Sequence, residues 1–154
     1  MGLFGKKQPP AEVVMYLIDE CTEYDFDIVG ESRCRDHLRA CIRQAPQEAR
    51  ELGEIATLAQ LVFEPTNEFD PNAIQVWINN GRVGYIAKAD NVSMGEVIRE
   101  AYARGATRVL AAARIGWDSD SSDPLIGVRL ALDDDVDNWR ALTRDEMVAE
   151  SEAQ

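Results

Sequence analysis

The sequence has few of the residues on which metal sites, disulfide scaffolds and membrane spans depend. Its 154 residues include three cysteines and a single histidine. No apolar run approaches the roughly 18 residues of a membrane-spanning helix, and residues 1–10 lack the long apolar core of a secretion signal. We therefore expect a cytoplasmic protein that makes no membrane contact and has no structural disulfide.

Catalytic motifs are also missing. No glycine-rich loop of the phosphate-cradling type is present, and the only histidine, His37, has no partners in a Ser-His-acid pattern. Paired acids such as Glu64 and Asp70 could hold a divalent ion, but nothing else in the chain is typical of a nuclease. The sequence therefore predicts a binding protein and not an enzyme.

The chain lacks a basic excess, and its acidic surplus sits at the two ends. The formal net charge is −12. Residues 33–132 hold 13 acids and 12 bases, whereas residues 1–32 hold 7 acids and 2 bases and residues 133–154 hold 8 and 2. Non-specific binding to long duplex DNA depends on many phosphate contacts, which this charge opposes. A nucleic-acid site here should therefore be small and directed to the end of a strand.

The length and the order of the expected elements indicate one domain of mainly β structure. Strands are expected at 26–32, 56–63, 73–78, 83–86, 107–117 and 125–132. Helices are expected at 33–44 and after caps at 90–93, the second with an inward stripe of Met94, Val97, Ile98, Ala101 and Tyr102. This order favours an α+β fold, a small and partly open barrel with two packed helices. Residues 1–25 should form a leader with an extra strand or short helix, and residues 133–154 an acidic tail.

The loop at 64–71 is the most informative stretch, because it is dense in turn-forming Pro, Asn and Asp. Its polar side chains allow two interpretations. In the first, the Asn and Asp side chains, Asn67, Asp70 and Asn72, cap the turn and Phe69 plugs the mouth of the barrel; in the second, these residues form a pocket for a terminal nucleotide together with Phe69. In the second case the ring stacks a base, and the carboxylate accepts a hydrogen bond from a free 3′ hydroxyl.

Basic and aromatic residues flank this expected pocket. Arg33, Arg35, Arg82 and Lys88 could contact phosphates, or they could belong to a solvated surface with salt bridges. We expect Trp77 and Trp117 to be core or barrel-edge residues. The turn at 79–81, Asn-Asn-Gly, can take the positive φ angles of a tight hairpin.

The cysteines and the histidine lie within one short segment, as Cys21, Cys34, His37 and Cys41. Three thiolates and an imidazole would suit zinc. However, Cys34 and Cys41 are seven helical residues apart, about 10 Å by the rise per residue, whereas the ligands of one ion must converge. Both also complete the apolar stripe of their helix. We expect no cofactor, and zinc is kept only as the lesser alternative.

The segment NEFDPNAIQVWINNGRVGYIAK, residues 67–88, resembles the signature of the HIRAN domain family, and Val-Gly-Glu-Ser at 29–32 resembles its opening strand. The resemblance implies an OB-like or SH3-like six-stranded barrel over residues 26–132. It also implies that Asp70 recognises a 3′ hydroxyl, with Phe69 beside it and Tyr85 and Lys88 on base or phosphate. Phe69 stands where many members have Tyr, and Glu68 where many have Pro.

From this resemblance we expect a stand-alone module of bacterial or viral type that binds 3′-OH ends of single-stranded DNA. Its role would be that of an accessory in DNA repair or processing, which leaves room for a helicase or nuclease partner. The hydrolase activity associated with the family resides in fused domains that this sequence does not contain. The alternative is an acidic protein-interaction or decoy module, in which the barrel is a scaffold and the charged ends bind a basic protein surface.

Overall fold

The structure is a computed structural model that describes residues 14–17, 26–132, 135, 137 and 139–142. Its strands are β1 (Val14–Leu17), β2 (Phe26–Asp27), β3 (Glu54–Phe63), β4 (Ile74–Ile78), β5 (Gly81–Tyr85), β6 (Arg108–Trp117), β7 (Ile126–Leu130) and β8 (Arg140–Leu142). Its helices are the 3-10 helix η2 (Glu31–Cys34) and the α-helices α1 (Arg35–Gln44), α2 (Gln47–Leu52) and α3 (Lys88–Ala103). Among these described helices, none has the length and apolar character needed to cross a membrane.

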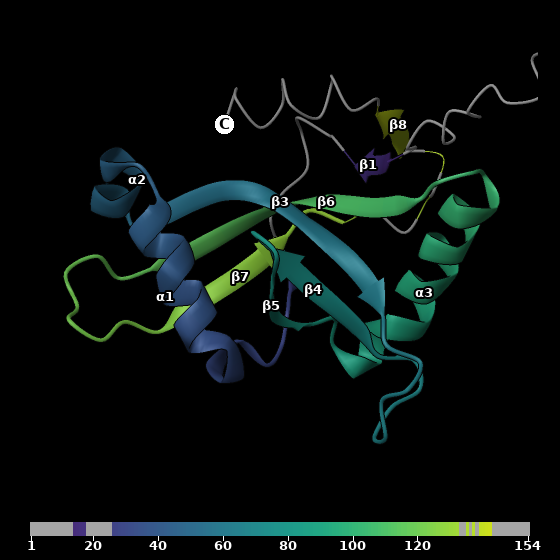
Figure 1. Ribbon diagram of the computed structural model, residues 1–154, viewed down its shortest axis with the longest axis horizontal. Coiled ribbons are helices and arrows are strands. Elements are labelled where there is room, and N and C mark those ends of the chain that lie inside the picture. Colours follow the sequence, from purple (N-terminus) through teal and green to yellow (C-terminus); the bar gives the residue numbers. More distant parts are fainter. Residues whose placement is uncertain (1–13, 18–25, 133–134, 136, 138, 143–154) are drawn as a thin grey trace, which may run out of the picture.

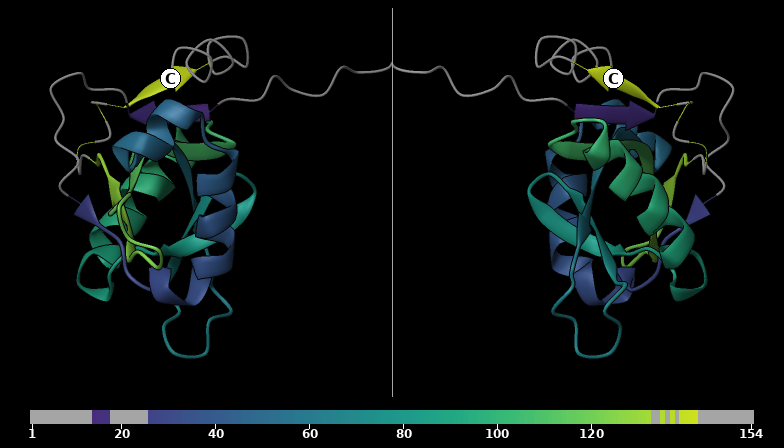
Figure 2. Two further views of the ribbon diagram at one scale, coloured as in Figure 1. Left: turned by 90° about the vertical axis from the view of Figure 1, so that its left-hand side faces the viewer. Right: turned by 90° about the vertical axis from the view of Figure 1, so that its right-hand side faces the viewer.

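Six strands curl into a small barrel, in the order β2-β7-β6-β3-β4-β5, with antiparallel neighbours throughout. Val29, just beyond β2, closes the ring against β5. Its N–H donates to the Tyr85 carbonyl at 2.9 Å, and the Tyr85 N–H donates to the Val29 carbonyl at 2.8 Å. The strands enclose the core when the molecule is turned on its side (Figure 2). The predicted α+β fold, a six-stranded OB-like barrel with packed helices, is confirmed.

Two further strands lie outside the predicted barrel range. β1 pairs in parallel with β6, and β8 pairs antiparallel with β1. The apolar run near residue 15, for which the sequence left strand and helix open, is therefore a strand. Trp139, just before β8, is 5% exposed and belongs to the core cluster. The rest of the predicted leader and most of the predicted tail lie outside the described residues.

The core follows from alternation along the strands. In β4, Ile74, Val76 and Ile78 are fully buried, whereas Gln75 and Trp77 between them are only half-buried. Burying each Ile or Val contributes about 1.5–3 kcal/mol. The helices close the barrel with their own apolar faces: Leu38 and Cys41 from α1, and Met94, Val97, Ile98 and Ala101 from α3.

The predicted hairpin turn is confirmed, and the predicted first strand is too long. Asn79 and Asn80 have φ angles of 49° and 63°, which a tight β4–β5 turn requires. The strand expected at 26–32 ends at Asp27, apart from the pairing of Val29. Gly30 has a φ of 85°, and this left-handed conformation turns the chain into η2.

The second predicted helix also differs in detail. α3 begins at Lys88 with Ala87 as its N-cap, ahead of the caps expected at 90–93. Lys88 is therefore in the first turn of a helix and not at the end of the hairpin. Tyr102, predicted on the buried stripe, is 38% exposed. Its ring lies 6.4 Å from that of Phe63, at the edge of the core.

Candidate nucleic-acid interface

The loop between β3 and β4 is held by its own polar side chains. Asn67 Oδ1 accepts the backbone N–H groups of Phe69 at 2.9 Å and Asp70 at 3.0 Å. Asn67 Nδ2 donates to Glu64 Oε2 at 3.0 Å, and Asp70 Oδ1 accepts the N–H of Asn72 at 2.9 Å. The turn-capping interpretation of Asn67 and Asp70 therefore holds. These bonds also fix the direction in which the loop presents its carboxylates.

The second oxygen of Asp70 connects the loop to α3. Asn91 Nδ2 donates to Asp70 Oδ2 at 2.6 Å, and Asn91 is only 3% exposed. Asp70 makes no ion pair within the described part of the chain, and each of its oxygens has accepted one hydrogen bond, so accepting capacity remains. Phe69 beside it is 90% exposed and does not plug the mouth of the barrel, so that part of the turn-capping interpretation is wrong. The loop thus offers a fixed hydrogen-bond acceptor next to a free aromatic ring.

Tyr85 links this loop to a basic region. Arg82 Nη1 donates to Tyr85 Oη at 3.0 Å, and the guanidinium carbon lies 5.1 Å from the centroid of the Tyr85 ring. Glu64 is hydrogen-bonded by Asn67 and by Tyr85, and both bonds lower the pKa of its carboxyl. Burial, followed by the bond to Glu64, raises the pKa of Tyr85. A continuous chain of side-chain bonds therefore runs from Arg82 through Tyr85 and Glu64 to Asn67.

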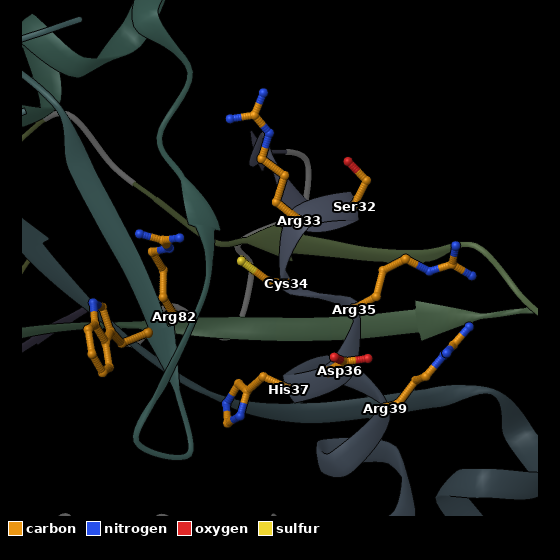
Figure 3. Close-up of a pocket in the computed structure, with 9 residues that line it drawn as sticks. Ser32, Arg33, Cys34, Arg35, Asp36, His37, Arg39 and Arg82 are labelled. Atoms are coloured by element: carbon orange, nitrogen blue, oxygen red, sulfur yellow. The ribbon is translucent and has the colours of Figure 1, made fainter. Parts of the chain in front are cut away.

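The basic region is a pocket of about 680 Å³ to which η2, the start of α1 and the β4–β5 hairpin contribute (Figure 3). We call it the arginine pocket. The residues that line it are Ser32, Arg33, Cys34, Arg35, Asp36, His37, Arg39, Trp77 and Arg82. In Figure 3, Arg35 and Arg39 extend to one side, away from Arg33 and Arg82. Arg82 Nε is buried and has no hydrogen-bond partner among the described residues.

The structure divides the predicted site between two places. The three arginines proposed as phosphate contacts, Arg33, Arg35 and Arg82, all line the arginine pocket. The residues proposed for the strand end, Asn67, Phe69, Asp70 and Asn72, lie on the β3–β4 loop, which does not line that pocket. Tyr85 stands between the two. Lys88 is exposed and has no ion pair among the described residues.

Sequence reasoning missed four of the residues that line the pocket, Ser32, Asp36, Arg39 and Trp77, and the last two are those suited to contact a nucleotide. Trp77, expected as a core or edge residue, faces outward because Val76 and Ile78 on either side face inward. Its indole Nε1 donates to Gln75 Oε1 at 2.7 Å. Arg39 lies one helical turn after Arg35 and therefore on the same face of α1. The period of two in β4 and the spacing of four in α1 were the signals that could have identified both.

The described residues provide no set of ligands for the zinc ion that the sequence left as an alternative. Among the residues that the structure describes, no group of three or more His, Cys, Asp or Glu side chains could hold a metal ion. His37 Nε2 donates to the Ile78 carbonyl at 2.7 Å, which docks α1 on the hairpin. Cys34 and Cys41 are buried free thiols, and burial raises the pKa of Cys41. Cys21 lies outside the described residues.

No family model matches the chain, and no curated protein matches it. Among solved structures, the chain is similar to the crystal structure of the HIRAN domain of human HLTF, at 14% sequence identity and a TM-score of 0.32. The similarity covers 65% of this chain and 84% of that chain. At values this low, the roles of individual residues must be argued from the geometry of this chain.

Proposed function

We propose that this chain binds single-stranded DNA and holds a free 3′ terminus. The arginine pocket carries the proposal: four arginines from two parts of the chain, Arg33, Arg35 and Arg39 from η2 and α1 and Arg82 from the hairpin, line one pocket together with a half-buried indole. Guanidinium groups bind phosphate through paired hydrogen bonds, and aromatic rings stack bases of any sequence. The acidic surplus lies outside residues 33–132. A pocket of this size therefore suits a few nucleotides, while the net charge disfavours long duplexes.

Two aromatic rings, the exposed Phe69 and the half-buried Tyr85, would bind the bases. Phe69 is 90% exposed, so a base can stack on it without any rearrangement of the protein. Tyr85 is held by Arg82 and presents an ordered ring between the loop and the pocket. Each base stacked on a ring typically contributes about 1–3 kcal/mol. Two such contacts could account for much of the affinity for a short single strand.

Asp70 would accept a hydrogen bond from the terminal hydroxyl. A carboxylate repels phosphate but accepts a hydrogen bond from a hydroxyl group, so an acid at this position favours an unphosphorylated 3′ end. Glu64 and Glu68 on the same loop add to that repulsion. Lys88 and Arg33 would then contact the phosphates that precede the terminus. The chain of bonds from Arg82 to Asn67 sets the spacing between the basic and acidic parts of the site.

The role that we propose is that of a binding accessory in DNA repair or processing, with no catalytic activity of its own. The alternative function places a protein interface at the two acidic ends. Those ends lie largely outside the described residues, so no structural observation favours it. Removing residues 1–11 and 143–154, which leaves Trp139 and β8 in place, would test it: a pull-down of a basic partner whose yield survives this removal excludes that interface.

Fluorescence anisotropy with short oligonucleotides tests the proposal. Single strands that end in a 3′ hydroxyl should bind at least about tenfold more tightly than the same strands with a 3′ phosphate, because the phosphate loses a hydrogen bond to a charged acceptor and gains repulsion. Asp70→Asn should reduce this preference. Equal affinity for the two ends would exclude recognition of the terminus, and no binding to either would exclude the function.

Two matched pairs of variants test which surfaces bind. Phe69→Ala should weaken binding about five- to a hundredfold if the ring stacks a base. Leu125→Ala removes an equally exposed apolar side chain, 88% exposed, and should change nothing. Arg82→Gln should weaken binding, whereas Arg114→Gln, which removes an arginine paired with Glu54 on β3, should not. Equal losses within either pair would place the ligand elsewhere.

A further inference from the structure

One acidic side chain reaches the arginine pocket from a distant part of the sequence. Asp123 lies in the loop between β6 and β7, and its Oδ1 is 2.6 Å from Arg35 Nη2 and 2.6 Å from Arg39 Nη2. The two arginines are one turn apart on α1, so their side chains meet at a single oxygen. Asp123 therefore pairs with two of the four cations that line the pocket and offsets one of their two positive charges.

We propose that Arg35 and Arg39 form a subsite for one phosphate group, and that Asp123 is a built-in occupant that the ligand must displace. This inference rests on the proposed function and names the ligand chemistry of one part of that site. Asp123 then sets both the affinity and the selectivity of the pocket. The subsite adds to the affinity of a ligand only if a phosphate group of that ligand replaces the Asp123 carboxylate.

The geometry of the three side chains fits such an exchange. A carboxylate oxygen shared by two guanidinium groups occupies the place that a phosphate oxygen would take, and phosphate offers further oxygens to the same donors. The pairing is open to water: the side chains of Arg35 and Arg39 are 38% and 43% exposed, and that of Asp123 is 67% exposed. Ion pairs this exposed are weak and are exchanged readily.

The loop that carries Asp123 can move away from Arg35 and Arg39 without disturbing the core. Apart from the two ion pairs of Asp123, its hydrogen bonds lie within the loop: the Asp120 N–H donates to Asp118 Oδ1 at 3.0 Å, and the Asp123 N–H donates to Ser121 Oγ at 3.3 Å. Leu125, where the loop returns to β7, is 88% exposed and does not anchor it. Displacing Asp123 therefore breaks two surface ion pairs and no buried contact.

This arrangement selects ligands that span the pocket. A small anion at Arg35 and Arg39 must compete with a carboxylate that is tethered to the chain and always nearby. An oligonucleotide that also contacts Arg33 or Arg82 has additional contacts with which to displace that carboxylate. Asp123 thus reduces occupancy by free phosphate more than occupancy by a strand of DNA.

Removing the charge of Asp123 tests the inference, with Asp120 as the matched control in the same loop. Asp123→Asn should bind a single-stranded oligonucleotide about three- to tenfold more tightly than the wild type, because two exposed ion pairs no longer compete. Asp120→Asn removes the same charge from the loop without touching Arg35 or Arg39, and should change affinity less than about twofold. Equal gains in both variants would mean that only the net charge of the loop matters, and would overturn the subsite.

A second measurement separates failure of the subsite from failure of the proposed function. The side-chain Nε–H signals of Arg35 and Arg39 can be followed by NMR while inorganic phosphate is added. They should shift at lower phosphate concentration in Asp123→Asn than in the wild type. A phosphate response without oligonucleotide binding would overturn DNA binding and keep the subsite. Oligonucleotide binding that leaves both signals unmoved would overturn the subsite and keep the function.

Discussion

The β3–β4 loop and the arginine pocket satisfy their polar groups in different ways. In the loop, Asn67 and Asp70 bond to neighbouring backbone and to side chains of the same loop or of α3. In the pocket, Arg35 and Arg39 pair with an exposed carboxylate from a distant loop, and Arg82 Nε has no partner among the described residues. Figure 1 places the β3–β4 loop beside α3 and the β6–β7 loop near α1 and α2.

This difference indicates what each of the two regions would contribute to binding. A loop whose acceptors are fixed by several bonds discriminates among ligands, since it cannot relax around a wrong one. A pocket whose cations hold exchangeable partners supplies affinity, since those cations are available to phosphates. Tyr85 couples the two regions, because it contacts Arg82 on one side and Glu64 on the other.

Disrupting the pairing of Val29 with Tyr85, which closes the barrel, should have the largest effect on stability, because both regions depend on it. A Cβ at Gly84 would lie 2.5 Å from the Val29 carbonyl oxygen and 2.8 Å from Ile28 Cδ1. Gly84→Ala should therefore lower the free energy of unfolding by about 2–3 kcal/mol, as overpacking does. Urea denaturation would measure it, with Gly127→Ala, whose Cβ meets nothing within 4 Å, as the control. If Gly84→Ala leaves the free energy of unfolding unchanged, the pairing of Val29 with Tyr85 does not close the barrel.

Loosening the loop alone should have a smaller effect on stability and a selective effect on binding. Asn67→Ala removes two acceptor bonds and one donor bond, and should cost about 1–2 kcal/mol of unfolding free energy. It should also reduce the preference for a 3′ hydroxyl over a 3′ phosphate, since Asp70 is no longer held. Asn72→Ala, whose side chain makes no hydrogen bond among the described residues, is the control. If both variants behave alike in denaturation and anisotropy, the loop is not organised by Asn67.

The pH dependence of stability should have opposite signs for Glu64 in the β3–β4 loop and for Glu31, which lies in η2 next to the arginine pocket without lining it. Hydrogen bonds from Asn67 and then Tyr85 hold the pKa of Glu64 below its ordinary 4.5. The unfolded chain then binds more protons below pH 4.5, so the stabilisation by Glu64 is complete above that pH and is lost as the pH falls through the folded pKa. Burial instead raises the pKa of Glu31 in η2 above 4.5. Its stabilising contribution is complete below pH 4.5 and is lost as the pH rises through the raised pKa.

Glutamine substitutions should expose these signs. At neutral pH, Glu64→Gln should be less stable than the wild type and Glu31→Gln more stable. The Glu31 difference should shrink as the pH falls through its raised pKa towards 4.5, whereas the Glu64 difference should shrink only as the pH falls below 4.5. Thermal denaturation across that range would measure them. If the two variants change stability in the same direction at neutral pH, the contrast between a hydrogen-bonded Glu64 and a buried Glu31 is wrong.

The smallest effect on stability should come from Asp123, despite its place in the pocket. Exposed ion pairs contribute little, so Asp123→Asn should change the unfolding free energy by less than about 1 kcal/mol. Urea denaturation beside the binding measurement would show whether affinity and stability separate, as they should for an exchangeable contact. If Asp123→Asn lowered the free energy of unfolding as much as Gly84→Ala does, Asp123 would be a structural residue of the barrel.

Much of the fold could be predicted because its signals are local. Alternation in β4 and the Asn79-Asn80-Gly81 turn define the hairpin, and the apolar stripe of α1 places Leu38 and Cys41 inward. The position of Tyr102 was predicted incorrectly, because the stripe is wider than the face that the barrel covers. The early start of α3 was missed because Ala87 caps it without a polar side chain.

For the candidate site, the sequence determined the kinds of chemistry present: turn-forming amides, one exposed ring and a set of arginines, each recognisable from residue type and short spacing. Only the tertiary structure decided which of them meet. Asp123 reaches Arg35 across 88 residues, and Asn91 reaches Asp70 across 21. Such pairings depend on how the barrel closes and on which loops its strands bring together. Because periodicity and propensity describe neighbours along the chain, they carry no information about contacts of this range.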